Sequence, residues 1–371
     1  MVKKEVFING EASSITMSKE PKNDRVKFQK DIGGYFRHMP PSPFLVFDGS
    51  IMPEELEKYA DYTDLRGIDA IVVKAGTSVL THTDPRRDDY NMKWLARDLT
   101  ALNKIKDDKG EYRYKVLLVT SGAIGQGRKQ RLRQPGVVIP EAKKNSPQQK
   151  RLDAIEGWPY LYNKWVQHFG QQEVKPMLVT HDYILEKPKN DNFKNILSQL
   201  LHNQIIPVIN ENDAKSLEEI DIMMNGVRAF GDNDGLSSLV AQYLKKMGYN
   251  PLLVLLSNTD GIYTIESVQN GLYVPIRVIK NAVGLENQVS DITSTRGRGG
   301  GIAKITAARN AAEAGVYTIV ANGQLCNHDA NFQREKRGAQ RLYRVIEAIL
   351  SGLVVGTRFI PKGYVTPAMA Y

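Results

Sequence analysis

Short apolar runs alternate along this chain with longer segments of helical periodicity. The apolar runs are rich in β-branched residues and leucine, and they predict buried strands at residues 71–73, 116–119, 177–179, 205–209, 252–256 and 317–320. Apolar positions at helical spacing predict helices over residues 92–102, 152–169, 192–202, 236–247, 302–314 and 341–350, the second of them interrupted near Gly157 and Pro159. This alternation predicts an α/β fold, a three-layer α/β/α sandwich whose mainly parallel central sheet is covered on both faces.

Polar residues follow the predicted strands and concentrate in two clusters. Residues 210–213 (NEND) directly follow the fourth strand, and residues 232–234 (DND) open the helix after it. In mainly parallel sheets, ligands bind beyond the carboxyl ends of the strands. Carboxylates and amides are costly to bury without partners, so their natural complement is a cationic set of lysines, Mg²⁺ and an ammonium group. For either cluster alone, a pair of Asx-rich caps and turns is the alternative interpretation.

Two glycine-rich segments also follow or precede predicted elements. Residues 122–129 (GAIGQGRK) nearly match a P-loop, but Arg128 and Lys129 replace its Lys and its Ser or Thr. Residues 296–304 (RGRGGGIAK) fail the dinucleotide fingerprint, because Ile302 stands where a third glycine is needed. Backbone amides that converge at a helix N-terminus still suit an anion, and the cationic second segment suits a polyphosphate. Turns or a surface loop without a ligand are the alternatives.

Length and composition place the chain among ordinary proteins with a sizeable core. It has 371 residues, of which 42% are hydrophobic and 25% charged. The single cysteine, Cys326, excludes an internal disulfide framework and fits a reducing compartment. No apolar run approaches the roughly 20 residues of a membrane span, and the N-terminus has no signal-peptide core. We therefore expect a cytoplasmic protein without a membrane partner.

The net charge of +9 is concentrated in one part of the chain. Residues 104–151 carry thirteen Lys or Arg against four Asp or Glu. Such a charge favours nucleic-acid binding, but Tyr112 and Tyr114 do not form the interleaved stacking array that a nucleic-acid surface uses. We expect a solvated basic face, with residues 128–133 flanking the mouth of the site and attracting an anionic substrate.

Six segments, in order, resemble the amino acid kinase family, and within it the glutamate 5-kinases and the kinase half of plant pyrroline-carboxylate synthases. They are residues 73–78 (VKAGTS), 119–127 (VTSGAIGQG), 208–214 (VINENDA), 230–237 (FGDNDGLS), 257–263 (SNTDGIY) and 298–304 (RGGGIAK). Residues 356–359 (GTRF) resemble the closing segment of the kinase domain. The resemblance implies a kinase domain over residues 67–362, a tail over 363–371 and no PUA-type domain, and it leaves 1–66 as an extension without visible chemistry.

The resemblance also implies an activity, namely ATP- and Mg²⁺-dependent phosphorylation of the γ-carboxylate of L-glutamate. It implies that Lys74 and Lys304 contact the transferring phosphoryl group and that Asp234 holds both lysines. The amino acid would be bound by Ser121, Gly122, Ala123, Asp213 and Asn233. The nucleotide would be bound by the two lysines and by Gly76, Ser257, Asn258, Arg298, Gly299, Gly300, Gly301, Ile302 and Ala303. No protein side chain is expected to ligate the metal, and we expect a homo-oligomer, either a dimer or a tetramer.

The chain departs from the family pattern at two places. Ser257 and Asn258 stand where the family usually has Thr-Asp, and residues 154–159 (AIEGWP) replace an Ala-Val-Gly-Gln helix start near the substrate pocket. The second departure keeps open a kinase that acts on another small acid or phosphate. A non-catalytic nucleotide-binding or regulatory protein is a third hypothesis, against which the retained Lys74, Asp234 and Lys304 argue.

Overall fold

The structure is a computed structural model. It describes residues 3–8, 11–16, 65, 67–80, 89–134, 146–215, 223–224, 227–228, 233–271, 274–280, 285, 289, 301–323, 345–350 and 355–364. Residues 17–64 of the predicted extension and the glycine segment before Gly301 lie outside the described residues. Among the described residues, no helix has the length and apolarity needed to cross a membrane.

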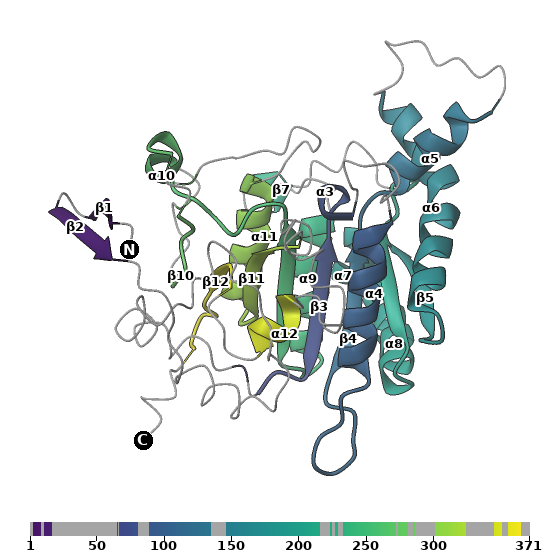
Figure 1. The fold of residues 1–371 in the computed structure, drawn as a ribbon. Helices are drawn as coiled ribbons and strands as arrows, with labels where there is room; N and C mark the ends of the chain where they lie inside the picture. Colours follow the sequence, from purple (N-terminus) through teal and green to yellow (C-terminus); the bar gives the residue numbers. More distant parts are fainter. Residues whose placement is uncertain are drawn as a thin grey trace, which may run out of the picture.

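An eight-stranded sheet forms the centre of the fold (Figure 1). Its order is β10-β12-β11-β9-β3-β4-β6-β5. The strands are β3 (Ala70–Ala75), β4 (Lys115–Thr120), β5 (Val174–Val179), β6 (Ile206–Glu211), β9 (Pro251–Ser257), β10 (Val278–Ile279), β11 (Tyr317–Asn322) and β12 (Thr357–Phe359). All neighbours pair in parallel except β11 and β12, which are antiparallel. Two small antiparallel pairs lie outside this sheet, β1 (Lys3–Ile8) with β2 (Glu11–Thr16) and β7 (Met223–Met224) with β8 (Val227–Arg228).

Helices cover both faces of the sheet, as the alternating pattern predicts. One apolar core joins the sheet to α3 (Thr77–Leu80), α4 (Tyr90–Asn103), α6 (Pro147–Phe169) and α12 (Val345–Leu350). The other joins it to α7 (His181–Leu185), α8 (Lys189–His202), α9 (Asn233–Lys246) and α11 (Gly301–Glu313). Two more helices are α5 (Ala123–Leu132) and α10 (Ile265–Gln269). Alternate residues of β3 enter the two cores, and this alternation points Lys74 to the face covered by α9 and α11.

The chain order creates a switch point beside β3. From β3 the chain proceeds to β4, β5 and β6 on one side, and then crosses to β9 and β11 on the other. Crossovers that leave in opposite directions open a crevice at the carboxyl ends of the strands between them. The carboxyl ends of β3 and β9 are therefore the expected place for a ligand, and Lys74 and Ser257 belong to these two strands.

The α5–α6 pair differs from the sequence prediction in two respects. The glycine-rich segment 122–129 was interpreted as a loop or turn after a strand, but α5 begins at Ala123, and Gly127 lies inside it. A Cβ at Gly127 would lie 1.8 Å from the Asp153 carbonyl oxygen, so this glycine serves close helix packing. The expected interruption of α6 is also wrong, because the helix runs through Gly157 and Pro159. Proline removes the hydrogen bond to Ile155, whose side chain is 56% exposed, so water can reach that turn.

Smaller differences concern the strands. β6 continues through Asn210 and Glu211, which were expected to follow it. β10 and β12 were not predicted, since each is very short and Arg358 lies in the middle of β12. Only residues 345–350 of the predicted helix 341–350 are described, and they are helical.

Candidate active site

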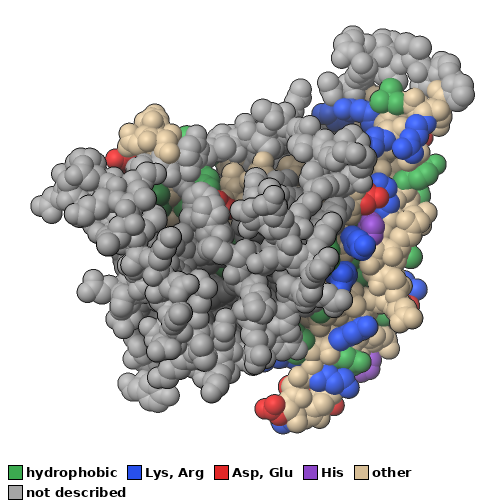
Figure 2. Space-filling view, in the orientation of Figure 1, with side chains coloured by type: hydrophobic (Ala, Val, Ile, Leu, Met, Phe, Trp, Pro, Cys, Tyr) green, Lys and Arg blue, Asp and Glu red, His purple; other side chains and the backbone are tan. Residues whose placement is uncertain are grey.

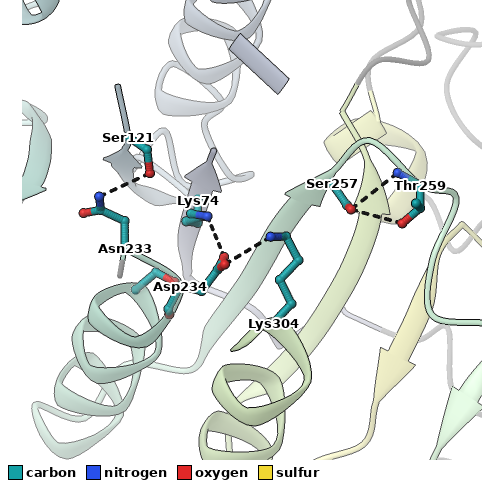
Figure 3. A network of polar contacts seen from close by, with 8 residues as sticks. Lys74, Ser121, Asn233, Asp234, Ser257, Thr259 and Lys304 are labelled. Carbon is teal, nitrogen blue, oxygen red and sulfur yellow. Dashed lines mark hydrogen bonds and ion pairs between the residues drawn. The ribbon is translucent and has the colours of Figure 1, made fainter. Parts of the chain in front are cut away.

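A buried carboxylate joins two lysines at the switch point (Figure 3). Asp234, in the first turn of α9, lies 2.7 Å from the Lys74 Nζ through Oδ1 and 3.1 Å from the Lys304 Nζ through Oδ2. Lys74 comes from β3 and Lys304 from the first turn of α11, which packs beside α9 through the hydrogen bond that Ser238 Oγ donates to the Ala307 carbonyl. Three distant parts of the chain thus meet at one carboxylate.

The charges of this trio explain how a carboxylate remains ionised there. Asp234 is 2% exposed and Lys74 is 5% exposed. Burial alone would raise the pKa of Asp234, but the charges and hydrogen bonds of Lys74 and Lys304 outweigh burial and hold its pKa below the ordinary value. Two cations share one anion, and the N-termini of α9 and α11 point the positive ends of their dipoles to the same edge. The trio therefore has a surplus of positive charge, which suits a phosphoryl group.

Asn233 connects the ends of three elements. Its Nδ2 donates to Ser121 Oγ at 3.2 Å and lies 3.4 Å from Asn210 Oδ1, while its Oδ1 accepts from the Glu211 backbone N–H at 3.0 Å. Figure 3 shows this amide beside Ser121, on the opposite side of Lys74 from Lys304. Gly122 follows with φ of 119°, a left-handed conformation that favours glycine, and Ala123 starts α5. These residues form a polar edge next to the lysines.

Carboxylates flank this polar edge. Asp213 lies two residues beyond β6, where burial first, and then the charge of Glu211, raise its pKa to about 6, against the opposing effect of a hydrogen bond with Asn210. Glu211 is 2% exposed, and its Oε1 lies 3.4 Å from His181 Nδ1. Asp213 titrates close to neutrality, so an ammonium ligand nearby would favour its ionised form.

The loop after β9 lies on the other side of Lys304 (Figure 3). Ser257 Oγ and Thr259 Oγ1 are 3.0 Å apart, and Thr259 Oγ1 donates to the Gly261 carbonyl at 3.0 Å. Gly76 directly follows the end of β3, and a Cβ there would be 3.2 Å from Lys74 Nζ. The backbone at Gly76 thus approaches the lysine more closely than most side chains would permit.

The structure brings most of the predicted site residues to one edge of the sheet. Lys74 and Lys304 each form an ion pair with Asp234, and Asn233 donates a hydrogen bond to Ser121. Gly76, Gly122, Ala123, Asp213 and Asn258 follow strand ends at this edge, Ser257 is the last residue of β9, and Gly301, Ile302 and Ala303 start α11. Arg298, Gly299, Gly300 and Asp232 lie outside the described residues.

Sequence patterns did not assign roles to several residues that support this edge. Asn210 contacts Asn233, Asn322 contacts the loop after β9, and Thr357 contacts the same loop from β12. Asn322 is the last residue of β11 and Asn210 the second-last residue of β6, so their positions near carboxyl ends were the available signal. The predicted solvated basic face is wrong for Arg131, whose guanidinium lies 2.6 Å from the fully buried Asp153. In Figure 2 the Lys and Arg side chains over α4 to α6 form separate patches rather than one band.

The fold and the lysine–carboxylate trio define the class of protein. A profile of the amino acid kinase family matches residues 69–322. The carbamate kinase of Giardia lamblia bound to AMP-PNP has the same fold, with a TM-score of 0.50 at 14% identity over 80% of this chain and 100% of that one. The chain belongs to the amino acid kinase family.

Curated relatives narrow the comparison to one group within the family. The glutamate 5-kinase of Clostridium acetobutylicum is 35% identical over 311 residues, which are 82% of this chain and 98% of that protein. The glutamate 5-kinase of Bacteroides thetaiotaomicron is 31% identical over 259 residues, 69% of this chain and 64% of that protein. The glutamate 5-kinase of Clostridium perfringens is 30% identical over 298 residues, 79% of this chain and 95% of that protein.

Proposed function

We propose that the protein transfers the γ-phosphoryl group of ATP to the γ-carboxylate of L-glutamate and forms L-glutamyl 5-phosphate, the first step of proline biosynthesis. The observation that carries this proposal is the contact of one buried carboxylate with two lysines at the switch point of an amino acid kinase fold. The similarity to glutamate 5-kinases supports L-glutamate as the acceptor.

The lysines would stabilise charge during the transfer, and the proposed reaction needs no covalent intermediate on the protein. Phosphoryl transfer depends mainly on positioning and charge neutralisation. Lys74 and Lys304 would stabilise negative charge on the transferring group, with Asp234 fixing the spacing of their ammonium groups. The acceptor carboxylate is already ionised at neutral pH, so the site needs no strong general base.

The amino acid would lie on the side of Lys74 where Asn233 and Ser121 meet. The Ser121 hydroxyl and the amides near Gly122 and Ala123 would bind its carboxylate, since α5 begins there and presents unpaired N–H groups. Asn233 would add an amide, and Asp213 would pair with the α-ammonium group. The pKa of about 6 leaves Asp213 largely ionised at neutral pH.

The nucleotide would lie on the side of Lys304, against the loop after β9. Gly76, Ser257 and Asn258 would line its subsite together with the start of α11. Residues 298–304 precede or begin α11, and a helix N-terminus binds phosphate through its unpaired amides. Arg298, Gly299 and Gly300, outside the described residues, keep this role as a prediction from the sequence.

Mg²⁺ would enter the site with ATP. Among the described residues no group of three or more His, Cys, Asp or Glu side chains could hold a metal, and Asp234 already contacts two lysines. Mg²⁺ commonly keeps several waters and binds through substrate phosphates, which fits a site with few protein ligands. When bound, the ion would neutralise part of the charge of the phosphates.

The proposal extends to organisation and partners. We propose one kinase domain over residues 67–362, a cytoplasmic location and no nucleic-acid partner. We also propose a dimer or tetramer that forms through α6 and the edge strand β5, because Leu152, Ile155 and Val166 share one side of α6 and are 54%, 56% and 40% exposed. Leu178 of β5 is 43% exposed nearby on the same face of the sheet. Light scattering of the purified protein measures the oligomeric state.

One observation favours a second candidate acceptor. A Cβ at Gly157 would lie 1.9 Å from the Ala123 carbonyl oxygen, so the unusual segment 154–159 packs directly on the proposed acceptor subsite. A different small carboxylate or phosphate is therefore the alternative substrate.

A coupled assay of ADP release tests the proposal. L-Glutamate should be the best acceptor in a panel that includes L-aspartate, N-acetyl-L-glutamate, carbamate and inorganic phosphate. A clear preference for another member of the panel would favour the second candidate. Nucleotide binding without turnover of any acceptor would instead favour the non-catalytic hypothesis.

A further inference from the structure

The loop over residues 257–263 is held from two other strands. Within the loop, Ser257 and Thr259 are joined through their hydroxyl groups, and Thr259 donates to the Gly261 carbonyl. These local bonds shape the turn, but they do not fix it relative to the rest of the sheet. The fixing contacts come from β11, which pairs with β9, and from β12, which pairs with β11.

The first contact comes from Thr357, the first residue of β12. Its side chain is fully buried, and its Oγ1 accepts the Ile262 backbone N–H at 2.8 Å. Gly261 has φ of 151°, and a Cβ there would lie 2.6 Å from Thr357 Oγ1. The loop backbone and the threonine hydroxyl are therefore fitted to each other without room for a larger group.

The approach of β12 to the loop depends on its direction. β12 runs antiparallel to β11, with Thr357 opposite Val320, so its beginning reaches the edge where β3, β9 and β11 end. Gly356 precedes it with φ of 71°, and a Cβ there would lie 2.2 Å from the Val320 carbonyl oxygen. A glycine at this position allows Thr357 to come within reach of the loop.

The second contact comes from the end of β11. Asn322 is 5% exposed, and its Nδ2 donates to Asp260 Oδ1 at 2.8 Å. The next residue, Gly323, donates its backbone N–H to the Ser257 carbonyl at 2.8 Å. The loop is thus held near its start and its middle by β11, and near its end by β12.

We propose that Thr357 and Asn322 are positioning residues for the nucleotide, which act by holding the loop over residues 257–263 in its binding conformation. The inference rests on the proposed function, which places ATP against Ser257 and Asn258. Thr357 and Asn322 belong to β12 and β11, whereas Ser121 follows β4 and Asn233 begins α9, so the acceptor subsite should not depend on them. Loss of these contacts with the loop should therefore weaken the binding of ATP but not the binding of L-glutamate.

Thr357→Val tests the proposal, because valine keeps the shape of threonine and removes the acceptor of the buried Ile262 N–H. Affinity for a non-hydrolysable ATP analogue with Mg²⁺, measured by calorimetry, should fall about tenfold, as expected when a buried donor loses its partner. Thr357→Ser keeps the hydroxyl and should retain affinity within about threefold. In steady-state kinetics, KM for ATP should rise in Thr357→Val while KM for L-glutamate stays within about twofold.

Thr318→Val is the matched control. Thr318 is also fully buried, on the neighbouring strand β11, but its hydroxyl contacts the Val316 carbonyl away from the loop. This variant should bind the analogue like the wild type, even if its Tm falls as much as that of Thr357→Val. Equal analogue affinity in Thr357→Val and Thr318→Val would overturn the role of Thr357.

Asn322→Ala provides a second test if Thr357→Val does not fold. It should weaken analogue binding several-fold, and wild-type affinity in this variant would overturn the proposal. Measurements on the wild-type protein distinguish a failure of this inference from a failure of the proposed function. If it binds the analogue but does not phosphorylate L-glutamate, weaker binding by Thr357→Val still supports the inference. If it binds no nucleotide, both are overturned.

Discussion

Replacing Asp234 with asparagine should reduce both turnover and stability. The substitution keeps the size of the side chain and removes the charge that Lys74 and Lys304 share at 2.7 and 3.1 Å. Lys74 is 5% exposed, so its ammonium group would be left in the protein interior beside a neutral amide. Removing one partner of a buried ion pair typically costs about 3–5 kcal/mol.

The expected size of the effects follows from this cost. At about 2–4 °C per kcal/mol for a domain of this order of size, the Tm at pH 8 should fall by roughly 6 °C or more. The lysines would also lose their fixed spacing, so kcat should fall by about 10²-fold, as for other groups that stabilise charge in a transition state. Differential scanning calorimetry and a coupled ADP-release assay measure the two quantities.

The pH dependence provides a more specific signature. The pKa of Asp234 is lower in the folded protein than its ordinary value, so its stabilising effect is present above the unfolded-state pKa of about 4 and is lost as the pH falls through the folded-state pKa. The Tm difference between Asp234→Asn and the wild type should therefore shrink below about pH 4. Lys74→Met/Asp234→Leu, which removes the two most buried charges of the trio together, should recover much of the Tm without activity. A Tm within 2 °C and a kcat within threefold of the wild type in Asp234→Asn would refute this reasoning.

Three further predictions concern other charged groups. Lys74→Ala and Lys304→Ala should each lower kcat by about 10²-fold or more in the ADP-release assay, and near-wild-type turnover in either variant would remove that lysine from the catalytic set. Asp213→Asn should mainly raise KM for L-glutamate. In the wild type, this KM should rise as the pH falls below about 6, because Asp213 becomes neutral there, and the variant should lack this rise. Because the raised pKa disfavours the ionised form, Asp213→Asn should also gain Tm relative to the wild type as the pH rises from about 4 to 8, and a loss of Tm would contradict the burial argument. Arg131→Ala should lower the Tm, because it leaves the fully buried Asp153 without its 2.6 Å partner. Arg133 is exposed, so Arg133→Ala should not lower the Tm. In both variants kcat/KM should change by less than about tenfold.

The main strands could be predicted because they are buried on both faces. β3, β4, β6, β9 and β11 are almost entirely buried, so their sequences are continuous apolar runs that stand out from the amphipathic helices. β12 has no such signal, since it has three residues with Arg358 between Thr357 and Phe359. The start of α5 was missed because glycines in a sequence indicate turns, whereas Gly127 provides close contact with α6.

The trio of Lys74, Asp234 and Lys304 could be predicted only through the family resemblance. Periodicity places each residue near a strand or helix end, but their meeting depends on crossovers that bring β3, α9 and α11 to one edge. Thr357 had no comparable signal. Its contact with Ile262 arises because β12 runs against the direction of its neighbour β11.

Trapping the product tests the central claim most directly. An acyl phosphate reacts with hydroxylamine to give a hydroxamate, and mass spectrometry identifies which carboxyl group carries it. With ATP, Mg²⁺, L-glutamate and hydroxylamine, the wild-type protein should form the γ-hydroxamate of glutamate together with an equal amount of ADP, and Lys74→Ala should form almost none. ADP release without a glutamate hydroxamate, or a hydroxamate on the α-carboxyl group, would contradict the account.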